Sequence, residues 1–92
     1  MIRTFRSRGL KRLHERDDAS RLRADQVGRI RNALADLDSA RSPRDLSIPR
    51  YRLHQLSGNL RGFWSIRITG NWRIVFRFEG DDVYDVDLVD YH

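Results

Sequence analysis

The stretch WSIRITGNWRIVF, residues 64–76, predicts a β-hairpin and decides how the rest of the chain folds around it. Two runs that alternate between apolar and polar residues flank Thr69, Gly70 and Asn71, and a turn this short requires antiparallel neighbours. With these three residues as the loop, the apolar positions pair across the hairpin: Trp64 with Phe76, Ile66 with Ile74, and Ile68 with Trp72. We expect this register.

A two-residue loop would instead pair Arg73 with Ile68 and mix charged with apolar side chains. A slip of one residue moves every side chain of a strand to the other face, so the apolar pattern favours the three-residue loop. One face of the hairpin then packs toward the core. The opposite face carries mostly polar and charged side chains, namely Ser65, Arg67, Arg73, Val75 and Arg77.

Alternating runs continue on both sides of the hairpin. The pattern predicts strands at Tyr51–Leu56, Gly62–Thr69, Trp72–Phe78 and Val83–Val89, with short turns at residues 57–59, 69–71 and 80–82. The strands form a β-meander, in which each one pairs with the next. If Leu53 points into the core, His54 points outward, toward the face that carries the arginines.

The first helix is predicted from a cap and two apolar residues. Residues 2–6 are a short candidate edge strand, and Ser7 then suits the N-cap of a helix that buries Leu10 and Leu13 on one side. This helix should end near residues 17–18.

A second helix is predicted where apolar residues recur three or four positions apart, at Val27, Ile30, Leu34 and Leu37. Ser42 and Pro43 end it, and residues 42–49 form a connection in which Leu46 and Ile48 reach the core. With 92 residues there is room for one core. The prediction is one α+β domain, residues 1–92, with two N-terminal helices packed on one face of an antiparallel sheet.

Composition narrows the class of partner. The chain has 18 basic and 13 acidic residues, and its last twelve residues hold five Asp and no base. All but one of the bases are Arg, whose planar fork holds phosphate bidentately, so a polyanionic partner is one interpretation. An ordinary solvated surface rich in Arg is the other. No apolar run approaches the roughly 20 residues of a membrane span, and no export signal is visible, so we expect a cytoplasmic protein.

A sheet face with three arginines and an imidazole suits a phosphodiester. Guanidinium groups stabilise charge that develops on phosphate oxygens, and His moves protons near neutral pH without a metal. Asp90, Tyr91 and His92 add a carboxylate, a phenol and a second imidazole where the chain leaves the sheet. The chain has no Cys, and three scattered His are not a zinc ligand set, so we expect no metal and no cofactor.

Each of these residues also has a structural interpretation. A single His in a strand is usually a hydrogen-bonded bystander, and terminal residues such as His92 often fray. The outward arginines can form ion pairs with Asp85 and Asp87 across the sheet. Trp64 and Trp72 fit the core better than a platform for base stacking.

Several motifs along nearly the whole chain resemble the HigB branch of the RelE-like toxins. They are Phe5 with Gly9 and Leu10; Arg52, Leu53 and His54; residues 62–66; Asn71 to Ile74 with Phe76 and Phe78; and the ending Asp90, Tyr91, His92. The resemblance implies a microbial-ribonuclease-like fold and a ribosome-dependent endoribonuclease. Such an enzyme cuts messenger RNA in the ribosomal A site by attack of the ribose 2′-hydroxyl on the adjacent phosphate.

The resemblance also implies which residues act. It places His54, Asp90, Tyr91 and His92 in the active site, with Arg73 as the charge stabiliser, and leaves open which His is the base. RNA contacts are expected from Arg52, Ser57, Arg67 and Arg77. Ser57 stands where relatives often have Lys, so one basic contact is missing unless Arg52 or Arg61 replaces it.

The implied partners are the 70S ribosome with its 16S rRNA, messenger RNA, and a HigA-type antitoxin with a helix-turn-helix domain. Operator DNA is expected to be bound only through the complex with the antitoxin. The Ser57 departure also motivates an alternative, in which the chain is an inactive relative that binds RNA or antitoxin as a regulatory module.

Overall fold

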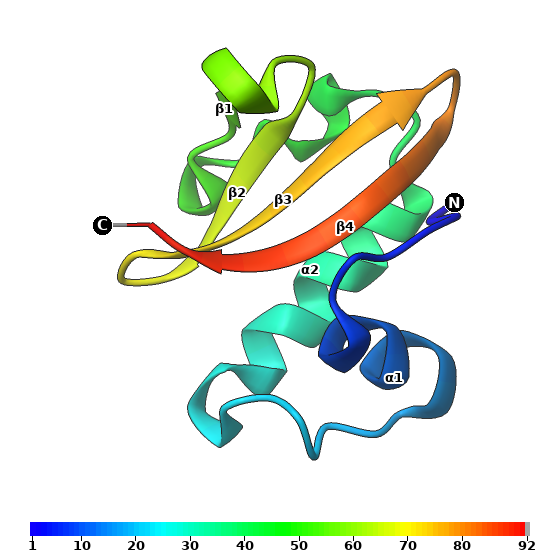
Figure 1. The fold of residues 1–92 in the computed structure, drawn as a ribbon, viewed down its shortest axis with the longest axis vertical. Coiled ribbons are helices and arrows are strands. Elements are labelled where there is room, and N and C mark those ends of the chain that lie inside the picture. Colours follow the sequence, from blue (N-terminus) through cyan, green and yellow to red (C-terminus); the bar gives the residue numbers. More distant parts are fainter. Residues whose placement is uncertain (92) are drawn as a thin grey trace.

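A four-stranded antiparallel sheet forms the C-terminal half of the chain, as Figure 1 shows. The computed structural model describes residues 1–91. The strands are β1 (His54–Gln55), β2 (Trp64–Thr69), β3 (Trp72–Glu79) and β4 (Asp82–Asp90), and they lie in the order β1-β2-β3-β4. Each strand pairs with its neighbour in the chain, so the predicted meander is confirmed.

Two helices precede the sheet, also as predicted. α1 (Arg8–Arg16) begins after Ser7, whose Oγ accepts the backbone N–H of Leu10 at 3.2 Å. α2 (Val27–Ser39) crosses behind the sheet in Figure 1 and contacts β2 and β4. It buries three of the four residues whose spacing predicted it, Ile30, Leu34 and Leu37, and the fourth, Val27, is half-buried. Over residues 1–91 no helix has the length and apolar character that a membrane crossing needs.

The register of the β2–β3 hairpin is confirmed at two of its three predicted pairs. Trp64 lies opposite Phe76 and Ile66 opposite Ile74, but Trp72 lies opposite Thr69 and not opposite Ile68. The register shifts by one residue between Arg67 and Thr69, so Ile68 forms a β-bulge in β2. A two-residue turn of Gly70 and Asn71 then joins the two strands. Gly70 has φ +51°, which a glycine adopts without steric cost. The bulge thus permits the tighter loop while the apolar side chains stay on the core face.

The strand predicted at Tyr51–Leu56 is wrong for most of its length. Pro49 opens a 3₁₀ turn at Pro49–Tyr51 because its ring presets a helical φ, and Arg52 then adopts a left-handed conformation with φ +45°. Tyr51 is carried into the core, where it is 3% exposed. Only His54 and Gln55 remain extended, so β1 covers just the first two residues of β2.

Residues 2–6 run beside β4 but form two isolated parallel bridges, at Ile2 and Phe5, and not the predicted strand. A β-bulge in β4 explains why the two bridges do not join into a continuous strand. Val75 of β3 lies opposite Asp87, whereas Arg77 lies opposite Tyr84, so Asp85 is one residue too many and has φ +57°.

Candidate active site

A groove of about 400 Å³ lies on the side of the sheet where β1, the β2–β3 turn and the end of β4 come together. Its lining residues are His54, Leu56, Ser57, Ser65, Asn71, Arg73 and Tyr91. We refer to these seven residues as the His54 groove. Four of them, His54, Ser57, Arg73 and Tyr91, were predicted to act in catalysis or RNA binding.

Strand pairing brings His54 and Arg73 together. His54 lies directly opposite Ser65 in the β1–β2 ladder, and directly opposed residues project from the same face. Arg73 reaches across from β3 and donates from Nη1 to Ser65 Oγ at 3.4 Å. Ser65 is 1% exposed and forms the floor between an exposed imidazole and a partly buried guanidinium.

The end of β4 is attached to the β2–β3 turn. Tyr91 donates its backbone N–H to the carbonyl oxygen of Asn71 at 2.8 Å, and Asp90 lies opposite Trp72 at the last pair of the β3–β4 ladder. The Tyr91 side chain is 38% exposed and lines the groove. Asp90 precedes it at the exposed strand end, and the predicted catalytic His92 lies outside the described residues.

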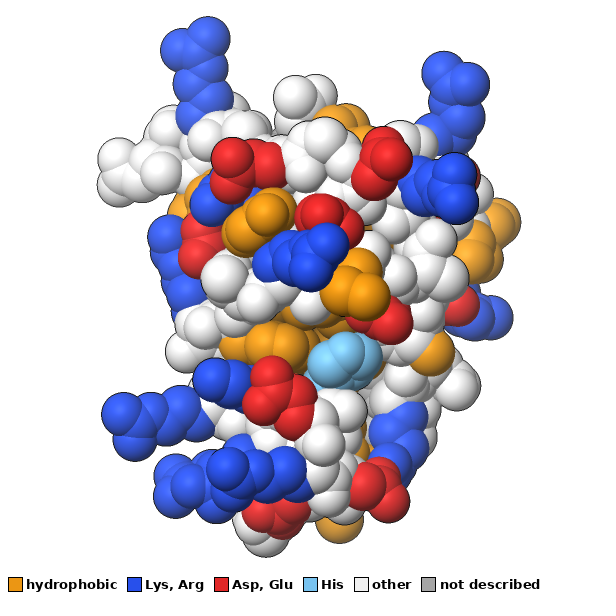
Figure 2. Space-filling model, turned by 90° about the vertical axis from the view of Figure 1, so that its right-hand side faces the viewer, with side chains coloured by type: hydrophobic (Ala, Val, Ile, Leu, Met, Phe, Trp, Pro, Cys, Tyr) orange, Lys and Arg blue, Asp and Glu red, His pale blue; other side chains and the backbone are white. Residues whose placement is uncertain are grey.

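The described lining residues of the His54 groove include no carboxylate, in contrast to the N-terminal side of the molecule. Figure 2 shows that side, where acidic and basic side chains alternate around apolar atoms and one histidine. There Asp82 receives Arg3 Nε at 3.1 Å and the N-terminal ammonium group at 3.4 Å, and the hydrogen bond from Arg3 lowers the pKa of Asp82. By contrast, Arg73 is the one cation among the described residues that line the His54 groove.

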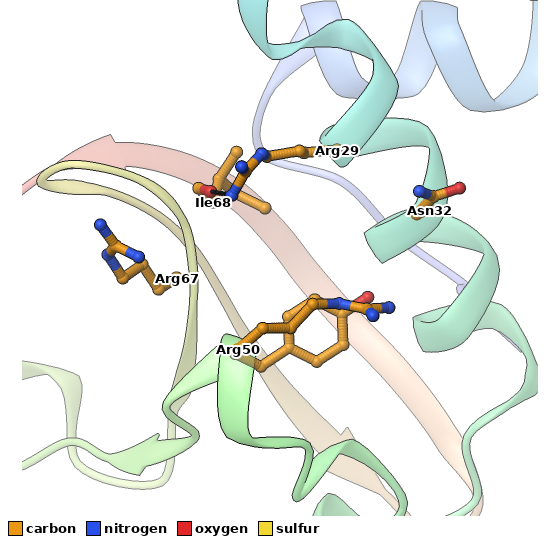
Figure 3. A pocket seen from close by; sticks show the side chains of 6 residues that line it. Arg29, Asn32, Arg50, Arg67 and Ile68 are labelled. Carbon is orange, nitrogen blue, oxygen red and sulfur yellow. Dashed lines mark hydrogen bonds between the residues drawn. The ribbon is translucent and has the colours of Figure 1, made fainter.

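Arg52 and Arg67, both predicted RNA contacts, lie outside this groove. Arg52 lines a separate hollow with Ser47, Ile48, Pro49 and Leu53. Arg67 donates from Nε to the carbonyl oxygen of Gly70 at 3.2 Å and lines a third hollow with Arg29 of α2, which Figure 3 shows. Their roles in RNA binding stay predictions.

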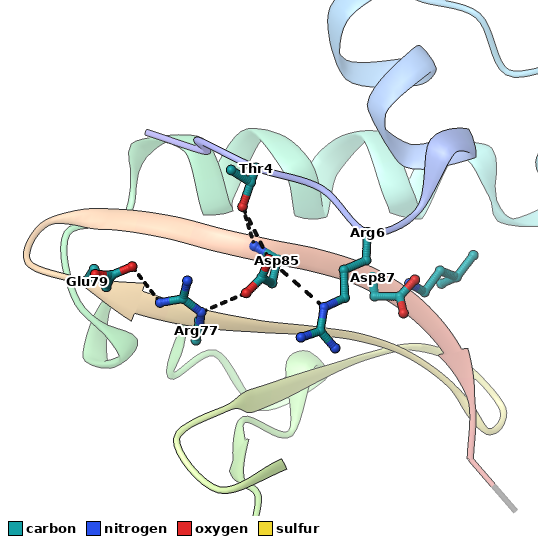
Figure 4. Close-up of polar contacts among 7 residues, drawn as sticks. Thr4, Arg6, Arg77, Glu79, Asp85 and Asp87 are labelled. Carbon is teal, nitrogen blue, oxygen red and sulfur yellow. Dashed lines mark hydrogen bonds and ion pairs between the residues drawn. The ribbon is translucent and has the colours of Figure 1, made fainter. Parts of the chain in front are cut away.

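Arg77 is engaged by carboxylates, as Figure 4 shows. Its Nε donates to Asp85 at 2.8 Å and its Nη1 to Glu79 at 2.6 Å. The hydrogen bond from Arg77 lowers the pKa of Asp85, with Arg6 adding a weaker attraction from 4.0 Å. Arg77 therefore forms the ion pair across the sheet that was the structural interpretation of the outward arginines. It does not line the His54 groove.

Ser65 and Asn71 are groove residues that the sequence analysis did not select. Ser65 shares the outward face with Arg73, so strand alternation contained a signal for it. Asn71 lines the groove because of the conformation of the β2–β3 turn, which depends on the bulge at position 68. The alternation of apolar and polar residues does not predict a bulge. Among residues 1–91, no three His, Asp or Glu side chains gather as a metal site would require.

Solved structures of toxins share this fold. The YoeB–YefM complex from Staphylococcus aureus contains a chain with a TM-score of 0.62 and 20% identity, over 100% of this chain and 95% of that one. The YoeB/ParE toxin from Agrobacterium tumefaciens gives a TM-score of 0.58 at 21% identity, over 99% and 96%. At this level of identity the likeness establishes the RelE-like toxin fold, as expected.

Sequence comparison gives the family. Residues 3–92 match the model of the HigB-like toxins, described as the RelE-like toxin of the type II toxin–antitoxin system HigB. The chain belongs to this family. It is 40% identical over 92 residues to Endoribonuclease HigB of Proteus vulgaris, covering all of both chains. It is 32% identical over 80 residues to Toxin HigB-1 of Vibrio cholerae serotype O1, covering 85% of this chain and 84% of that one.

Proposed function

We propose that this HigB-like toxin is an endoribonuclease that cleaves messenger RNA in the ribosomal A site without a metal ion. The main structural support is the His54 groove, which is lined by an imidazole, a guanidinium and a phenol. Support for RNA cleavage also comes from the Proteus vulgaris relative, which is named an endoribonuclease and matches this chain over its whole length.

The proposed reaction needs two proton transfers. The 2′-oxygen of a ribose attacks the adjacent phosphorus, one side chain takes the 2′-hydroxyl proton, and another gives a proton to the departing 5′-oxygen. The products are a 2′,3′-cyclic phosphate and a 5′-hydroxyl. His54 and His92 are the two proton carriers, and Asp90 would orient an imidazole or the nucleotide. Either direction of transfer is compatible with the position of His54.

Arg73 stabilises the negative charge that grows on the phosphate oxygens during this attack. Its hydrogen bond to buried Ser65 limits the orientations of the guanidinium before substrate arrives, which is the condition for electrostatic preorganisation. Tyr91 projects its exposed ring from the end of β4, where it can stack on a base or orient the phosphate.

Dependence on the ribosome follows from how little the groove itself offers for substrate binding. His54 and Ser57 are exposed, and Arg73 is the one cation among the described lining residues. A single arginine gives weak affinity for a polyanion at physiological salt. We therefore propose that the ribosome holds the message in place and the toxin supplies the reacting groups.

The partner of a type II toxin is its antitoxin, and we propose a HigA-type protein with a helix-turn-helix domain. Operator DNA would be bound through that protein in the complex. The proposed compartment is the bacterial cytoplasm, where translating ribosomes are found.

The decisive experiment compares His54→Ala with the parent protein on purified ribosomes carrying a defined message. We expect the substitution to slow cleavage by at least about 100-fold, since one proton carrier is lost. His14→Ala is the matched control, because His14 lies on α1 beside Asp38 and Phe5, away from the groove. Equal cleavage by the parent and His54→Ala would refute the proposal.

The groove also carries an observation in favour of a second function. Ser57 lines it at a position where the resemblance to HigB toxins implies a Lys, so the groove has one cation among its described lining residues where two are expected. An inactive relative that binds RNA or antitoxin would tolerate this loss. The same ribosome experiment separates the two, because message cleavage by the purified parent protein eliminates the inactive module.

A further inference from the structure

A second hollow, of about 330 Å³, lies between α2 and the edge of β2. Its lining residues are Arg29, Asn32, Arg50, Tyr51, Arg67 and Ile68, shown in Figure 3, and we refer to them as the arginine pocket. None of them lines the His54 groove. The pocket therefore needs an explanation other than the catalytic chemistry.

The pocket exists because β1 is short. β1 pairs only with residues 64–65, so β2 is the edge of the sheet from residue 66 onward. Figure 3 shows Arg29 reaching from α2 to this edge, where its Nη1 donates to the carbonyl oxygen of Ile68 at 3.4 Å. Arg67 projects from the same edge and donates to Gly70. Two guanidinium groups are thus fixed to backbone oxygens, which carry no net charge.

The pocket holds more positive than negative charge. Arg29 and Arg67 form no ion pair with any carboxylate among residues 1–91. Arg50 has Asp36 at 3.8 Å, but Asp36 also accepts a hydrogen bond from the Tyr51 hydroxyl. Three guanidinium groups therefore share one carboxylate, and each has further N–H donors to offer an anion.

Arg50 adds a flat surface to this charge. Its guanidinium lies 5.1 Å from the centre of the buried Tyr51 ring, and its side chain is 64% exposed. The ring supports one side of the guanidinium plane. An exposed guanidinium plane is a surface on which nucleic-acid bases stack.

Arg67 connects the arginine pocket with the His54 groove. It lies directly opposite Arg73 in the β2–β3 ladder, where side chains of opposed residues are about 5 Å apart at Cβ. Arg73 lines the groove and Arg67 lines the pocket. The two sites are therefore neighbours around the edge of the sheet, and a strand of RNA in one needs only a few further nucleotides to reach the other.

We propose that the arginine pocket binds a backbone phosphate of the same RNA strand whose scissile linkage occupies the His54 groove. This inference rests on the proposed function and extends it, since it gives the substrate a second point of attachment beyond the reacting phosphate. Arg29, Arg50 and Arg67 neutralise the phosphate, and the supported plane of Arg50 accepts an adjacent base. An acidic segment of a protein partner is the competing occupant.

The test measures binding of the full chain to labelled single-stranded RNA with 2′-O-methyl riboses, which cannot be cleaved. One probe has about three nucleotides and fills only the groove, and the other has about ten and reaches both sites. The variant Arg29→Gln/Arg50→Gln removes two charges from the pocket. The control Arg21→Gln/Arg44→Gln removes two charges from arginines that line neither site.

We expect the pocket variant to bind the longer probe about tenfold more weakly and the shorter probe within about twofold of the parent. The dependence of log Kd on log salt concentration should become shallower by about 0.7 for each lost phosphate contact. Arg29→Lys/Arg50→Lys keeps both charges and should restore the salt dependence. Circular dichroism melting verifies that each variant is folded.

Three results would overturn the proposal. They are unchanged affinity and salt dependence for the longer probe, an equal loss in the Arg21→Gln/Arg44→Gln control, and loss of antitoxin binding with RNA binding intact. Message cleavage on ribosomes distinguishes this failure from failure of the proposed function. If the parent cleaves and His54→Ala does not, the function stands while the pocket assignment falls.

Discussion

Tyr91 donates its backbone N–H to the carbonyl oxygen of Asn71 at 2.8 Å, so the end of β4 is attached to the turn between β2 and β3. This contact places Tyr91 beside Arg73, which lies two residues after Asn71 and lines the same groove. The position of Tyr91 in the groove therefore depends on the conformation of a two-residue turn.

Gly70→Val tests that dependence. Gly70 has φ +51°, and a β-branched residue there is strained, so we expect a loss of about 1–2 kcal/mol in the free energy of unfolding. Message cleavage should fall further than the folded fraction does, because Tyr91 is displaced with the turn. Denaturant unfolding and a ribosome cleavage assay measure the two effects.

Gly28→Ala is the control for this substitution. Gly28 lies in α2 with nothing within 4 Å of an added Cβ, so its stability should be unchanged or raised by up to about 1 kcal/mol. Cleavage by the Gly70→Val protein in proportion to its folded fraction would show that the turn does not position the groove.

Arg73→Ala and Arg77→Ala should have opposite consequences. Arg73 is the cation of the groove, so its loss should lower kcat by about 100-fold or more and cost about 1 kcal/mol of stability through the lost hydrogen bond to Ser65. Arg77 bridges Asp85 and Glu79, so its loss should lower the melting temperature and leave kcat within about threefold. A large loss of kcat in Arg77→Ala would show that RNA displaces Asp85 from this arginine.

Acid should weaken the fold through Asp85. The Arg77 guanidinium holds the pKa of Asp85 below its ordinary value of 3.8, so the folded protein binds fewer protons here than the unfolded chain. The contribution of Asp85 is complete above the ordinary value and disappears as the pH falls through the lowered one. Urea unfolding should therefore show Asp85→Asn less stable than the parent at neutral pH.

The difference between Asp85→Asn and the parent should close as the pH falls below 3.8. Asp87→Asn is the matched control, because Asp87 lies opposite Val75 and accepts the N–H of Leu88. A gap between parent and Asp85→Asn that stays constant from neutral to low pH would contradict this account.

The sequence predicts those features of the structure that neighbouring residues determine, and misses those that depend on residues far apart in the chain. Alternation at Leu53 and His54 and along β3 predicts that His54 and Arg73 share a face, since side-chain direction in a strand is local. The difference between Arg73 and Arg77 is not local. It arises from the bulge at Asp85, which shifts the β3–β4 register by one residue between Val75 and Arg77, and no period-two pattern contains an extra residue.

The shortening of β1 has a local cause that alternation conceals. Tyr51 and Leu53 fit the alternating apolar pattern of a strand. Pro49, however, presets a helical φ, and the chain turns at Arg52 before it becomes extended. This turn leaves the edge of β2 uncovered from residue 66 onward. The arginine pocket follows from that uncovered edge, which explains why the sequence did not reveal it.

Ser57→Lys should strengthen substrate binding, because Ser57 lines a groove with one cation among its described residues. A second cation near the scissile phosphate should lower KM on ribosomes several-fold and steepen the salt dependence of RNA binding by about 0.7. Gln55→Lys is the matched control, because Gln55 lies opposite Trp64, so its side chain projects away from His54. If both variants lower KM equally, the gain comes from net charge, and Ser57 then has no particular place in the RNA site. If only Ser57→Lys lowers KM while kcat stays near the parent value, the added charge acts in uniform binding and adds nothing to the transition-state stabilisation by Arg73.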